Sequence, residues 1–552
     1  MSTQERLQSV IHQLEVGIGA HLIRWLLMLV VLAGMVVCYD TRAYHSFNSP
    51  EAMDAAQLAR NLAEGRGYTT EFIRPFSLYL LQKHNHAAKL SEVASTNFVD
   101  AAQIYTAHPD LANAPLYPMV LAGMFKAYTP QWKTDTRKPF WSEGGNFRRY
   151  QPEFRIAIMN QLLLFAVVVL TFLVTRKLFD GTAAWLAAGL TLGSDVLWKF
   201  SVSGLSTMLL MVIFMVLAWC LVKIDENSRD AEPNVRRLIV FALLAGLLTG
   251  LGMLTRYSFG WLIMPVAIFI ALFGGARRLG LVVAAVLAFG LVVSPWMLHN
   301  ISVSGTLFGT AGYAVTEVDG SRLMQSLNPN MNSAFELGSL RHKLFDNLGG
   351  ILQGDIFRLA GGWPAILFFA GLLLGLRNLS ARRLRYFTLM CLGVLLIVQA
   401  LGRTGLSDIT PEFNSENLLV LLTPFVVIFG VVFFLTLLAQ INMRSSQARL
   451  GVIAVLVVLT VWPLVATNIN KVQPIAYPPY YPPDVQKISD WMRPDELIMS
   501  DIPWAVAWYG DRQCTWTTPN AKNEFYALND YVKPVHALYL TCLLYTSPSP
   551  RD

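Results

Sequence analysis

Long apolar segments alternate with short polar ones over most of the chain, from residue 22 to residue 467. An α-helix needs roughly 20 mostly apolar residues to cross the hydrocarbon core of a bilayer, so the pattern predicts about eleven transmembrane helices. They are expected near residues 22–39, 155–175, 183–199, 206–222, 238–255, 258–273, 279–298, 363–376, 386–402, 417–438 and 450–467. The apolar run 115–128 is too short to span and lies beside two prolines, which favours an interfacial helix.

Basic residues in the connections predict how these helices are oriented. Every second connection is short and basic, at 176–177, 236–237, 277–278, 377–385 and 444–449. Cytoplasmic loops of membrane proteins carry an excess of Lys and Arg, so these connections and the N-terminal segment 1–21 are expected inside. The long connections 40–154 and 299–362, and everything after residue 467, are then expected outside.

The two ends of the chain lead to separate expectations. The first apolar run is expected to stay as an anchor, because Arg24 lies inside its start and no small-residue cleavage site precedes the next helix. Residues 22–470 form the predicted transmembrane domain. Residues 471–541 change to a soluble α/β pattern, with strand-like pieces at 497–512 and 535–541, and are expected to form a small, incomplete outer domain. Residues 542–552, CLLYTSPSPRD, resemble adapter read-through and are expected to be non-native.

Composition agrees with a membrane protein. Hydrophobic residues make up 54% of the chain and charged residues 14%, whereas a soluble chain has roughly 25% charged residues. The formal charge of +7 follows largely from the basic cytoplasmic connections, so it is poor evidence for a nucleic-acid partner. The five cysteines show neither metal-ligand spacing nor a disulfide pattern. We expect no cofactor, although a divalent metal ion stays open.

A short acidic helix is predicted at 48-NSPEAMDAAQLARNLAEGRGY-68, directly after the first span. Ser49 can cap its start and Pro50 suits the first helical position. Glu51 then lies in the first turn, and Asp54 shares its face because the two residues are three positions apart.

Ionisable and amide side chains in the rest of the predicted membrane region avoid the bilayer centre, where each charge is costly. They lie at the expected outer ends of spans, at Asp195, Lys199, Arg256, His299 and Asn300. Each one alone is explained equally well by anchoring at the interface. Together with the acidic helix, their outward clustering favours a functional site at the outer membrane surface.

Six segments carry a resemblance to a known family, and together they cover most of residues 20–470. They are 59-ARNLAEGRGY-68, 115-PLYPMVLAGMFKAY-128, 172-FLVTRKLFDGTAAWLAAGL-190, 249-TGLGMLTRYSFGWLIMP-265, 294-SPWMLHNISVSGTLFG-309 and 416-ENLLVLLTPFVVIFG-430. In order and spacing they resemble the GT-C superfamily of membrane glycosyltransferases. The similarity is to the branch of protein mannosyltransferases and the lipid A aminoarabinose transferase.

The resemblance implies an inverting transferase whose donor is a sugar on a polyprenyl phosphate. The family's catalytic Asp falls on Glu51, and a family arginine falls on Arg256, which would bind the donor phosphate. His299 stands where the family usually has Arg before Asn300, and both are included in the expected phosphate-binding set. A second family acid falls on Thr207, so Asp54 is the expected source of a second catalytic carboxylate.

Two other classes of function compete with this interpretation. A secondary transporter or lipid flippase would place ionisable groups or broken helices at the midplane, often in two repeated halves. A structural or polymer-length-controlling membrane protein would need no clustered carboxylates. The sugar and the acceptor, whether protein, lipid or glycan, stay open. The family branch implies a bacterial inner membrane with the site facing the periplasm.

Overall fold

The structure, a computed structural model, describes residues 18–44, 46–90, 107–317, 322–329, 337–356, 359–410, 413–441, 445–469 and 480–541. The predicted tail 542–552, most of the predicted linker after residue 470 and most of segment 1–21 lie outside the described residues. The described part is mostly helical, with one small parallel sheet.

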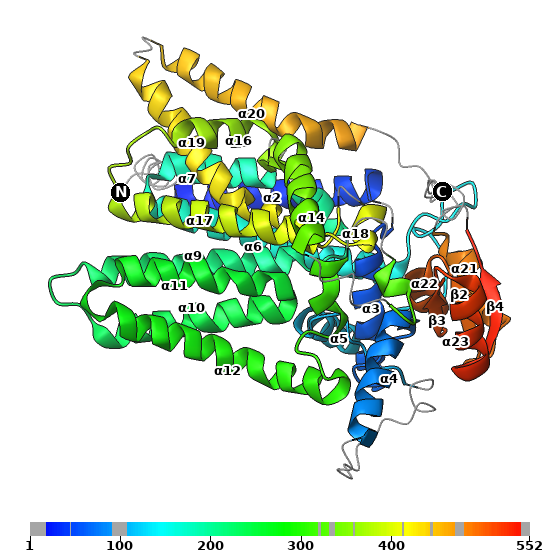
Figure 1. The fold of residues 1–552 in the computed structure, drawn as a ribbon. Coiled ribbons are helices and arrows are strands. Elements are labelled where there is room, and N and C mark those ends of the chain that lie inside the picture. The colour runs from blue at the N-terminus through cyan, green and yellow to red at the C-terminus, as the bar shows by residue number, and fades with distance from the viewer. Residues whose placement is uncertain are drawn as a thin grey trace.

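Eight helices in the described residues are long and apolar enough to cross a membrane, and each coincides with a predicted span. They are α2 (Ile18–Arg42), α6 (Gln151–Leu178), α9 (Thr207–Ser228), α10 (Val235–Thr255), α12 (Arg278–Ser304), α17 (Leu379–Gly402), α19 (Thr423–Gln440) and α20 (Ser446–Ile469). They form the elongated helical body in Figure 1.

The other three predicted spans form shorter helices, so the predicted number of about eleven is not confirmed. The segment 183–199 divides at Gly193 into α7 (Gly181–Leu192) and α8 (Asp195–Val202). The segment 258–273 becomes a 3-10 turn, η2 (Tyr257–Leu262), followed by α11 (Ile263–Phe273). The third is the short α16 (Trp363–Gly371).

Helices α10 and α12 approach closely because glycine lines their contact. A Cβ built at Gly246 would lie 2.0 Å from the carbonyl oxygen of Ala285, and one at Gly250 would lie 3.0 Å from Val292. Small residues permit such contacts between membrane helices, where dispersion forces provide much of the packing energy.

The helix ends that are expected on the cytoplasmic side lie together at one end of the bundle. There the buried carboxylate of Asp225 accepts hydrogen bonds from Arg229, at 2.9 Å, and from Ser380, at 2.6 Å. It also pairs with Arg383, which comes from the start of α17. Figure 1 shows the helical connections of this end on the left, opposite α3 and the sheet.

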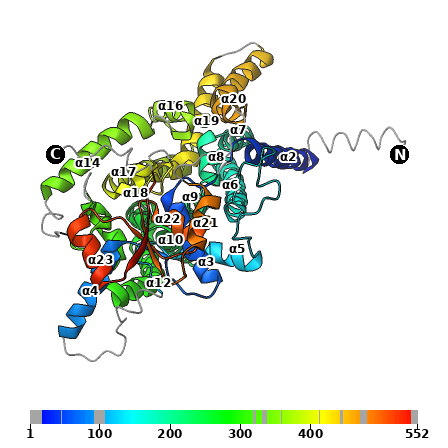
Figure 2. The ribbon, with the colours of Figure 1, turned by 90° about the vertical axis from the view of Figure 1, so that its right-hand side faces the viewer.

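The acidic helix forms as α3 (Pro50–Ala63), followed by β1 (Phe72–Ile73), α4 (Pro75–Leu90) and α5 (Leu116–Ala127). Pro50 begins α3 as predicted, and the chain turns away at Gly65 and Gly67, whose φ angles are 80° and 77°. Only α5 corresponds to the predicted interfacial helix. Figure 2 shows α3 and α5 at the outer end of the bundle, where they pack together.

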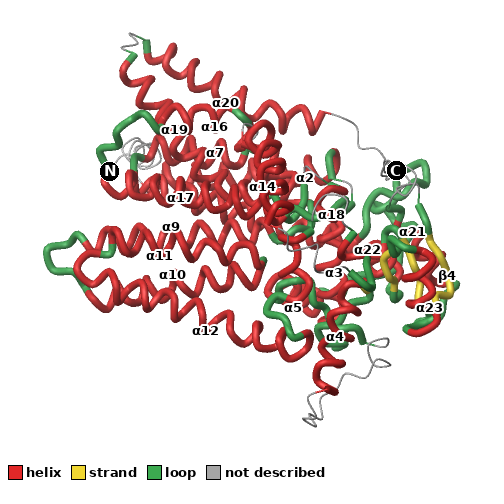
Figure 3. Tube along the Cα trace, viewed as in Figure 1, coloured by secondary structure: helices red, strands yellow, loops and turns green. Residues whose placement is uncertain are grey.

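The parallel sheet has the order β1-β3-β2-β4, and its strands lie at the end of the helical body in Figure 3. Its other strands are β2 (Leu497–Ser500), β3 (Cys514–Trp516) and β4 (Val535–Tyr539). Phe72 of β1 is in register with Cys514 of β3, so the first outer connection contributes a strand to the sheet of the C-terminal segment.

Helices surround the sheet, and they correct one expectation. They are α21 (Pro482–Asp490), α22 (Pro503–Ala505), η9 (Val506–Gly510), η10 (Ala521–Phe525) and α23 (Tyr526–Tyr531). The strand-like piece 497–512 forms a strand only at its start, because residues 503–510 are helical. Trp504 and Trp508 are four positions apart, so a helical turn buries both rings, and both are 0% exposed.

The second outer connection and the segments near it form several short helices. They are η4 (Gly309–Thr316), η5 (Leu323–Gln325), α14 (Leu337–Gly350), η6 (Ile351–Asp355), η7 (Leu359–Gly361), α18 (Gly405–Ile409) and η8 (Leu418–Leu422), with η3 (Gly275–Arg277) at the opposite end of the bundle. In Figure 2, α14 lies along the rim of the bundle.

Candidate active site

The carboxylate of Glu51 lies at the N-terminal end of α3 and accepts two side-chain hydrogen bonds. Ser49 donates to Oε2 at 2.5 Å and Ser415 donates to Oε1 at 3.2 Å. Ser49 therefore contacts the carboxylate and makes no side-chain cap bond to the helix. Burial raises the pKa of Glu51 and the neighbouring charge of Glu416 adds to that effect, whereas the Ser49 hydroxyl and Arg256 lower it. The net result is a pKa above the usual value of a glutamate.

Arg256 lies where α10 ends and η2 begins, and its extended backbone breaks the helix there. Its Nη2 atom is 3.0 Å from Oε1 of Glu416, and the two side chains are 11% and 20% exposed. The N–H bonds of Nη2 do not point at this carboxylate, so the atom is buried without a hydrogen bond among the described residues. The guanidinium therefore keeps donor capacity for another acceptor.

Two adjacent residues connect the base candidate to the arginine. Ser415 contacts Glu51, and Glu416 contacts Arg256. The site thus brings together α3, the break between α10 and η2, and the segment before η8. Sequence reasoning placed Glu51 and Arg256 at the same membrane level but missed Glu416. The available signal was an acidic residue at the outer start of a predicted span, within one of the six family-like segments.

Asp54 lies in a different cluster, although it shares α3 with Glu51. Its Oδ2 atom accepts hydrogen bonds from Arg74 and from Asn113, both at 2.7 Å, and the residue is 1% exposed. The second carboxylate that acts on Glu51 is therefore Glu416, and Asp54 helps to fix the first outer connection to α3.

Two more titratable groups are buried in the Asp54 cluster. Burial and the charge of Asp54 raise the pKa of Asp110 to about 7, against the effect of Arg74. Burial lowers the pKa of His108 to about 3, and its Nε2 atom lies 2.8 Å from the Ser77 hydroxyl. The cluster ties residues 108–113 to α3 and α4.

No contact between described residues places Asn300 or His299 next to the Arg256 guanidinium. The Asn300 amide donates to the Tyr257 hydroxyl at 3.4 Å and to the Leu307 carbonyl at 2.9 Å. His299 is exposed, and its ring centroid lies 5.0 Å from that of Trp296. Because Tyr257 directly follows Arg256, Asn300 supports the arginine's segment from the side of α12.

Asp195 and Lys199, the other polar pair predicted at the outer level, form an ion pair with each other. Asp195 Oδ2 lies 2.9 Å from Lys199 Nζ, and its Oδ1 accepts a hydrogen bond from Thr467 at 3.0 Å. These contacts join α8 to α20. They support the anchoring interpretation for this pair.

The C-terminal segment, residues 480–541, packs against α3 next to the site. The Trp504 indole donates to the Tyr480 hydroxyl at 2.9 Å, and α22 packs against α3. Burial raises the pKa of Tyr480, and the charge of Glu51 adds to this effect. A phenol hydroxyl thus lies near the base candidate.

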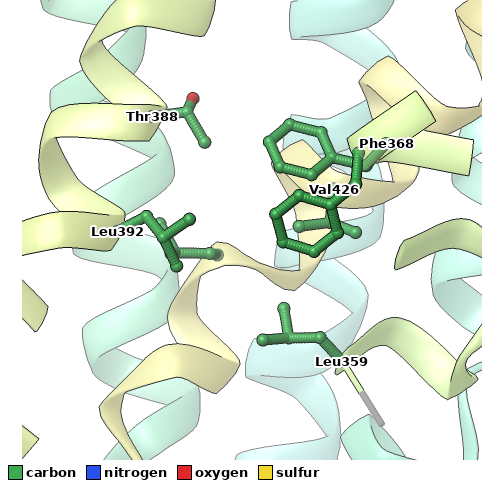
Figure 4. A pocket seen from close by; sticks show the side chains of 7 residues that line it. Leu359, Phe368, Thr388, Leu392 and Val426 are labelled. Atoms are coloured by element: carbon green, nitrogen blue, oxygen red, sulfur yellow. The ribbon is translucent and has the colours of Figure 1, made fainter. Parts of the chain in front are cut away.

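A small apolar cavity lies away from these polar groups. Figure 4 shows it between α16, α17 and the start of α19, and its lining consists of Leu359, Phe368, Phe369, Thr388, Leu392, Leu422 and Val426. It lacks the charged groups that transfer chemistry requires. Within the described residues, no group of three or more His, Cys, Asp or Glu side chains is arranged to hold a metal ion.

Comparison with known proteins now adds independent information. Residues 149–299 match the family described as dolichyl-phosphate-mannose-protein mannosyltransferase. No curated protein sequence matches the chain. The fold is similar to that of the oligosaccharyltransferase AglB from Archaeoglobus fulgidus, solved with an inhibitory peptide and a dolichol-phosphate. That match has a TM-score of 0.52 and 11% identity and covers 88% of this chain and 64% of the archaeal chain.

A second solved structure is similar over nearly the whole length of both chains. It is ArnT from Cupriavidus metallidurans bound to undecaprenyl phosphate, with a TM-score of 0.52 and 12% identity. The match covers 93% of this chain and 89% of the other. The chain therefore has a fold similar to that of these two proteins, and its residues 149–299 match a mannosyltransferase family. The predicted resemblance to the GT-C superfamily is supported by the family match over residues 149–299 and by the two similar folds.

Proposed function

We propose that this protein transfers a sugar from a polyprenyl-phosphate donor to an acceptor at the outer membrane face, with inversion at the anomeric carbon. The observation that carries the proposal is the placement of a glutamate with a raised pKa and a partly buried arginine on either side of the Ser415–Glu416 segment. The lipid phosphates named in the two similar structures support the choice of donor.

Glu51 is the proposed general base. The acceptor hydroxyl gives its proton to the Glu51 carboxylate while its oxygen bonds to the anomeric carbon. A base is most effective when its pKa is close to the working pH, so the raised pKa of Glu51 suits this role. The hydrogen bonds from Ser49 and Ser415 hold the carboxylate in one orientation.

Arg256 is proposed to bind the phosphate of the leaving group. The bond between the anomeric carbon and the phosphate oxygen breaks on the side opposite the attack, and its electron pair stays on the phosphate. A guanidinium stabilises this charge through charge-assisted, directed hydrogen bonds. The Nη2 atom that lacks a hydrogen bond is available for such a contact. Asn300 supports the arginine's segment, and His299 takes no part.

The surroundings are part of the proposal. Residues 22–470 form the membrane domain, and the C-terminal segment closes the site from outside. In this proposal the basic end of the bundle faces the cytoplasm, as the positive-inside rule favours, and the site faces the periplasm of a bacterial inner membrane. The acceptor is a protein, a lipid or a glycan that reaches Glu51 from the side of the outer connections.

A turnover assay with the purified protein in lipid nanodiscs tests the proposal. A polyprenyl-phosphate sugar labelled in its sugar is mixed with candidate acceptors, and release of the polyprenyl phosphate is followed. We expect release, with the product carrying the opposite anomeric configuration by NMR. Movement of the intact donor across a bilayer without any release would instead favour the flippase.

A further inference from the structure

The Arg256–Glu416 ion pair occupies the same guanidinium that is proposed to bind the donor phosphate. The guanidinium that is expected to hold the donor phosphate already lies 3.0 Å from a carboxylate. Carboxylates and phosphates are alternative partners of the same guanidinium, since both offer anionic oxygens to its N–H groups. A donor phosphate that approaches Arg256 therefore meets the charge of Glu416.

The geometry of the pair shows that Glu416 is a weak partner. The Nη2–Oε1 distance fits an ion pair, but the N–H direction does not fit a hydrogen bond. The charge attraction is therefore present without the directed bond that makes such pairs strong. An anion able to face the N–H groups of Arg256 would bind more strongly than Glu416 does.

Charge balance leads to the same result. Glu51 lies close enough for the charge of Glu416 to act on it, so the resting site holds two carboxylates and one arginine. A bound phosphate would add a further negative charge. Like charges in a partly buried site repel strongly. Glu416 must then move away from Arg256.

We propose that Glu416 is the resting counter-ion of Arg256 and gives way to the donor phosphate, so that donor binding exchanges one anion for another. This inference rests on the proposed function. It assigns to Glu416 a role in donor affinity and not in the bond-breaking step. Glu416 neutralises the partly buried Arg256 while the site is empty, and it lowers the affinity for the donor by competing with the donor phosphate.

A link to pH follows from the same exchange. Because the phosphate adds negative charge near Glu51, whose pKa is already raised by burial, binding favours proton uptake by the Glu51 carboxylate, and affinity should fall as pH rises. The charged groups facing Glu416 are Arg256 and Glu51. The Arg403–Asp355 pair adjoins it at the end of α17, where a Cβ built on Gly402 would lie 2.9 Å from Glu416 Oε2. The Tyr480 phenol is the remaining titratable group near Glu51.

The test measures equilibrium binding of polyprenyl monophosphate, without a sugar, to the full chain in nanodiscs. We expect Glu416→Gln to bind this lipid roughly tenfold more tightly, the size of a typical coupling between two sites. Glu416→Asp keeps the negative charge on a shorter side chain, farther from Arg256. Its affinity for the lipid should lie between those of Glu416→Gln and the unmodified protein.

Thermal stability gives a second measurement that does not depend on turnover. Without lipid, Glu416→Gln should melt at a lower temperature, because the partly buried Arg256 loses the carboxylate that neutralises it. Polyprenyl monophosphate should then raise the melting temperature of Glu416→Gln more than that of the unmodified protein. Asp355→Asn is the matched control, since it breaks the neighbouring ion pair with Arg403. It should leave lipid affinity unchanged.

The outcomes separate this inference from the proposed function. Equal or weaker lipid binding by Glu416→Gln, with Glu416→Asp no tighter than the unmodified protein, would show that Glu416 holds Arg256 in place and would overturn the exchange. That result would leave the proposed function standing if the unmodified protein binds the lipid and turns over. Failure of the unmodified protein to bind polyprenyl monophosphate or to release it from a donor would overturn both.

Discussion

Ser415 donates a hydrogen bond to Glu51 across 3.2 Å, although the two residues are 364 positions apart in the chain. The contact joins the first outer connection to the segment before η8. The position of the Glu51 carboxylate therefore depends on two elements that lie far apart in the chain and meet at one end of the bundle. This dependence makes Glu51 the first residue to test.

Glu51→Gln keeps the shape of the side chain and removes the base. We expect turnover to fall by a factor on the order of 10²–10⁴, with donor binding little changed. Glu51→Asp draws the carboxylate back by about 1.5 Å, one carbon–carbon bond, and should keep measurable activity. Single-turnover rates and donor affinity, measured separately, check both variants. Normal turnover by Glu51→Gln would place the base elsewhere.

Arg256→Ala should weaken binding of the polyprenyl-phosphate donor. A hydrogen bond to a charged group contributes roughly 1.5–3 kcal/mol, which corresponds to a loss of roughly 10- to 150-fold in affinity. Arg256→Lys should keep part of the affinity, because a point charge replaces a planar fork. Unchanged donor affinity in a folded Arg256→Ala protein would show that the arginine only anchors the end of α10.

Local patterns in the sequence were sufficient to predict most of the helices. Hydrophobic length located all eight long spans, and Pro50 and Gly65 located the ends of α3. Length failed where one predicted span contains a break, as at Gly193, and where a predicted span begins with a 3-10 turn, as at Tyr257–Leu262. Such breaks depend on neighbouring helices, which hydropathy does not encode. The pairing of β1 with β3 was missed for the same reason, since it joins residues more than 400 positions apart.

The candidate site was predictable only in part. Depth in the membrane and the family resemblance placed Glu51 and Arg256 at one level. The direction of a side chain was not predictable from spacing, and Asp54 shows this. It lies one helical turn from Glu51, yet it points to Arg74 and Asn113. Glu416 was missed because its importance depends on a contact with Arg256 across the fold.

Membrane sidedness can be tested at two exposed positions in a background without native cysteines. Lys133 belongs to the first outer connection and its side chain is 82% exposed, and Glu232 lies in the exposed turn between α9 and α10. Lys133→Cys should react with an impermeant thiol reagent in intact spheroplasts. Glu232→Cys should react only after the membrane is broken. The reverse pattern would invert the proposed orientation.

Trp508 anchors the C-terminal segment to the membrane domain. Its ring is 0% exposed, and its indole donates to the buried Glu153 carboxylate at 2.8 Å. Trp508→Ala should lower stability by roughly 3–5 kcal/mol if the loss resembles other large-to-small changes. Proteolysis should then begin in residues 480–541.

Trp491 provides the matched control for this change, because it lies in the same segment and is 73% exposed. Trp491→Ala should leave the protease pattern and the melting temperature nearly unchanged. If both variants behave like the unmodified protein, the aromatic contacts of η9 do not hold the C-terminal segment in place.

The buried Asp54 cluster leads to a prediction about pH. The pKa of Asp110 rises from 3.8 to about 7 on folding, because burial and the charge of Asp54 favour its neutral form. Between these values the folded protein holds a proton that the unfolded chain has released. The contribution of Asp110 to stability is therefore fully present below about pH 4 and is lost as pH rises through about 7. Asp110→Asn does not titrate and should not show this loss.

The difference in melting temperature between Asp110→Asn and the unmodified protein is the quantity to measure. The melting temperature of Asp110→Asn should rise relative to that of the unmodified protein as pH rises from about 5 to about 8. His108 has the opposite sign, since its pKa falls from 6.5 to about 3 on folding and its stability contribution is lost as pH falls. That effect is present in both proteins and cancels in the difference. His108→Gln should accordingly gain relative stability toward acid pH. A difference independent of pH for both variants would show that neither group is held in its neutral form, and the cluster would then act through its hydrogen bonds alone.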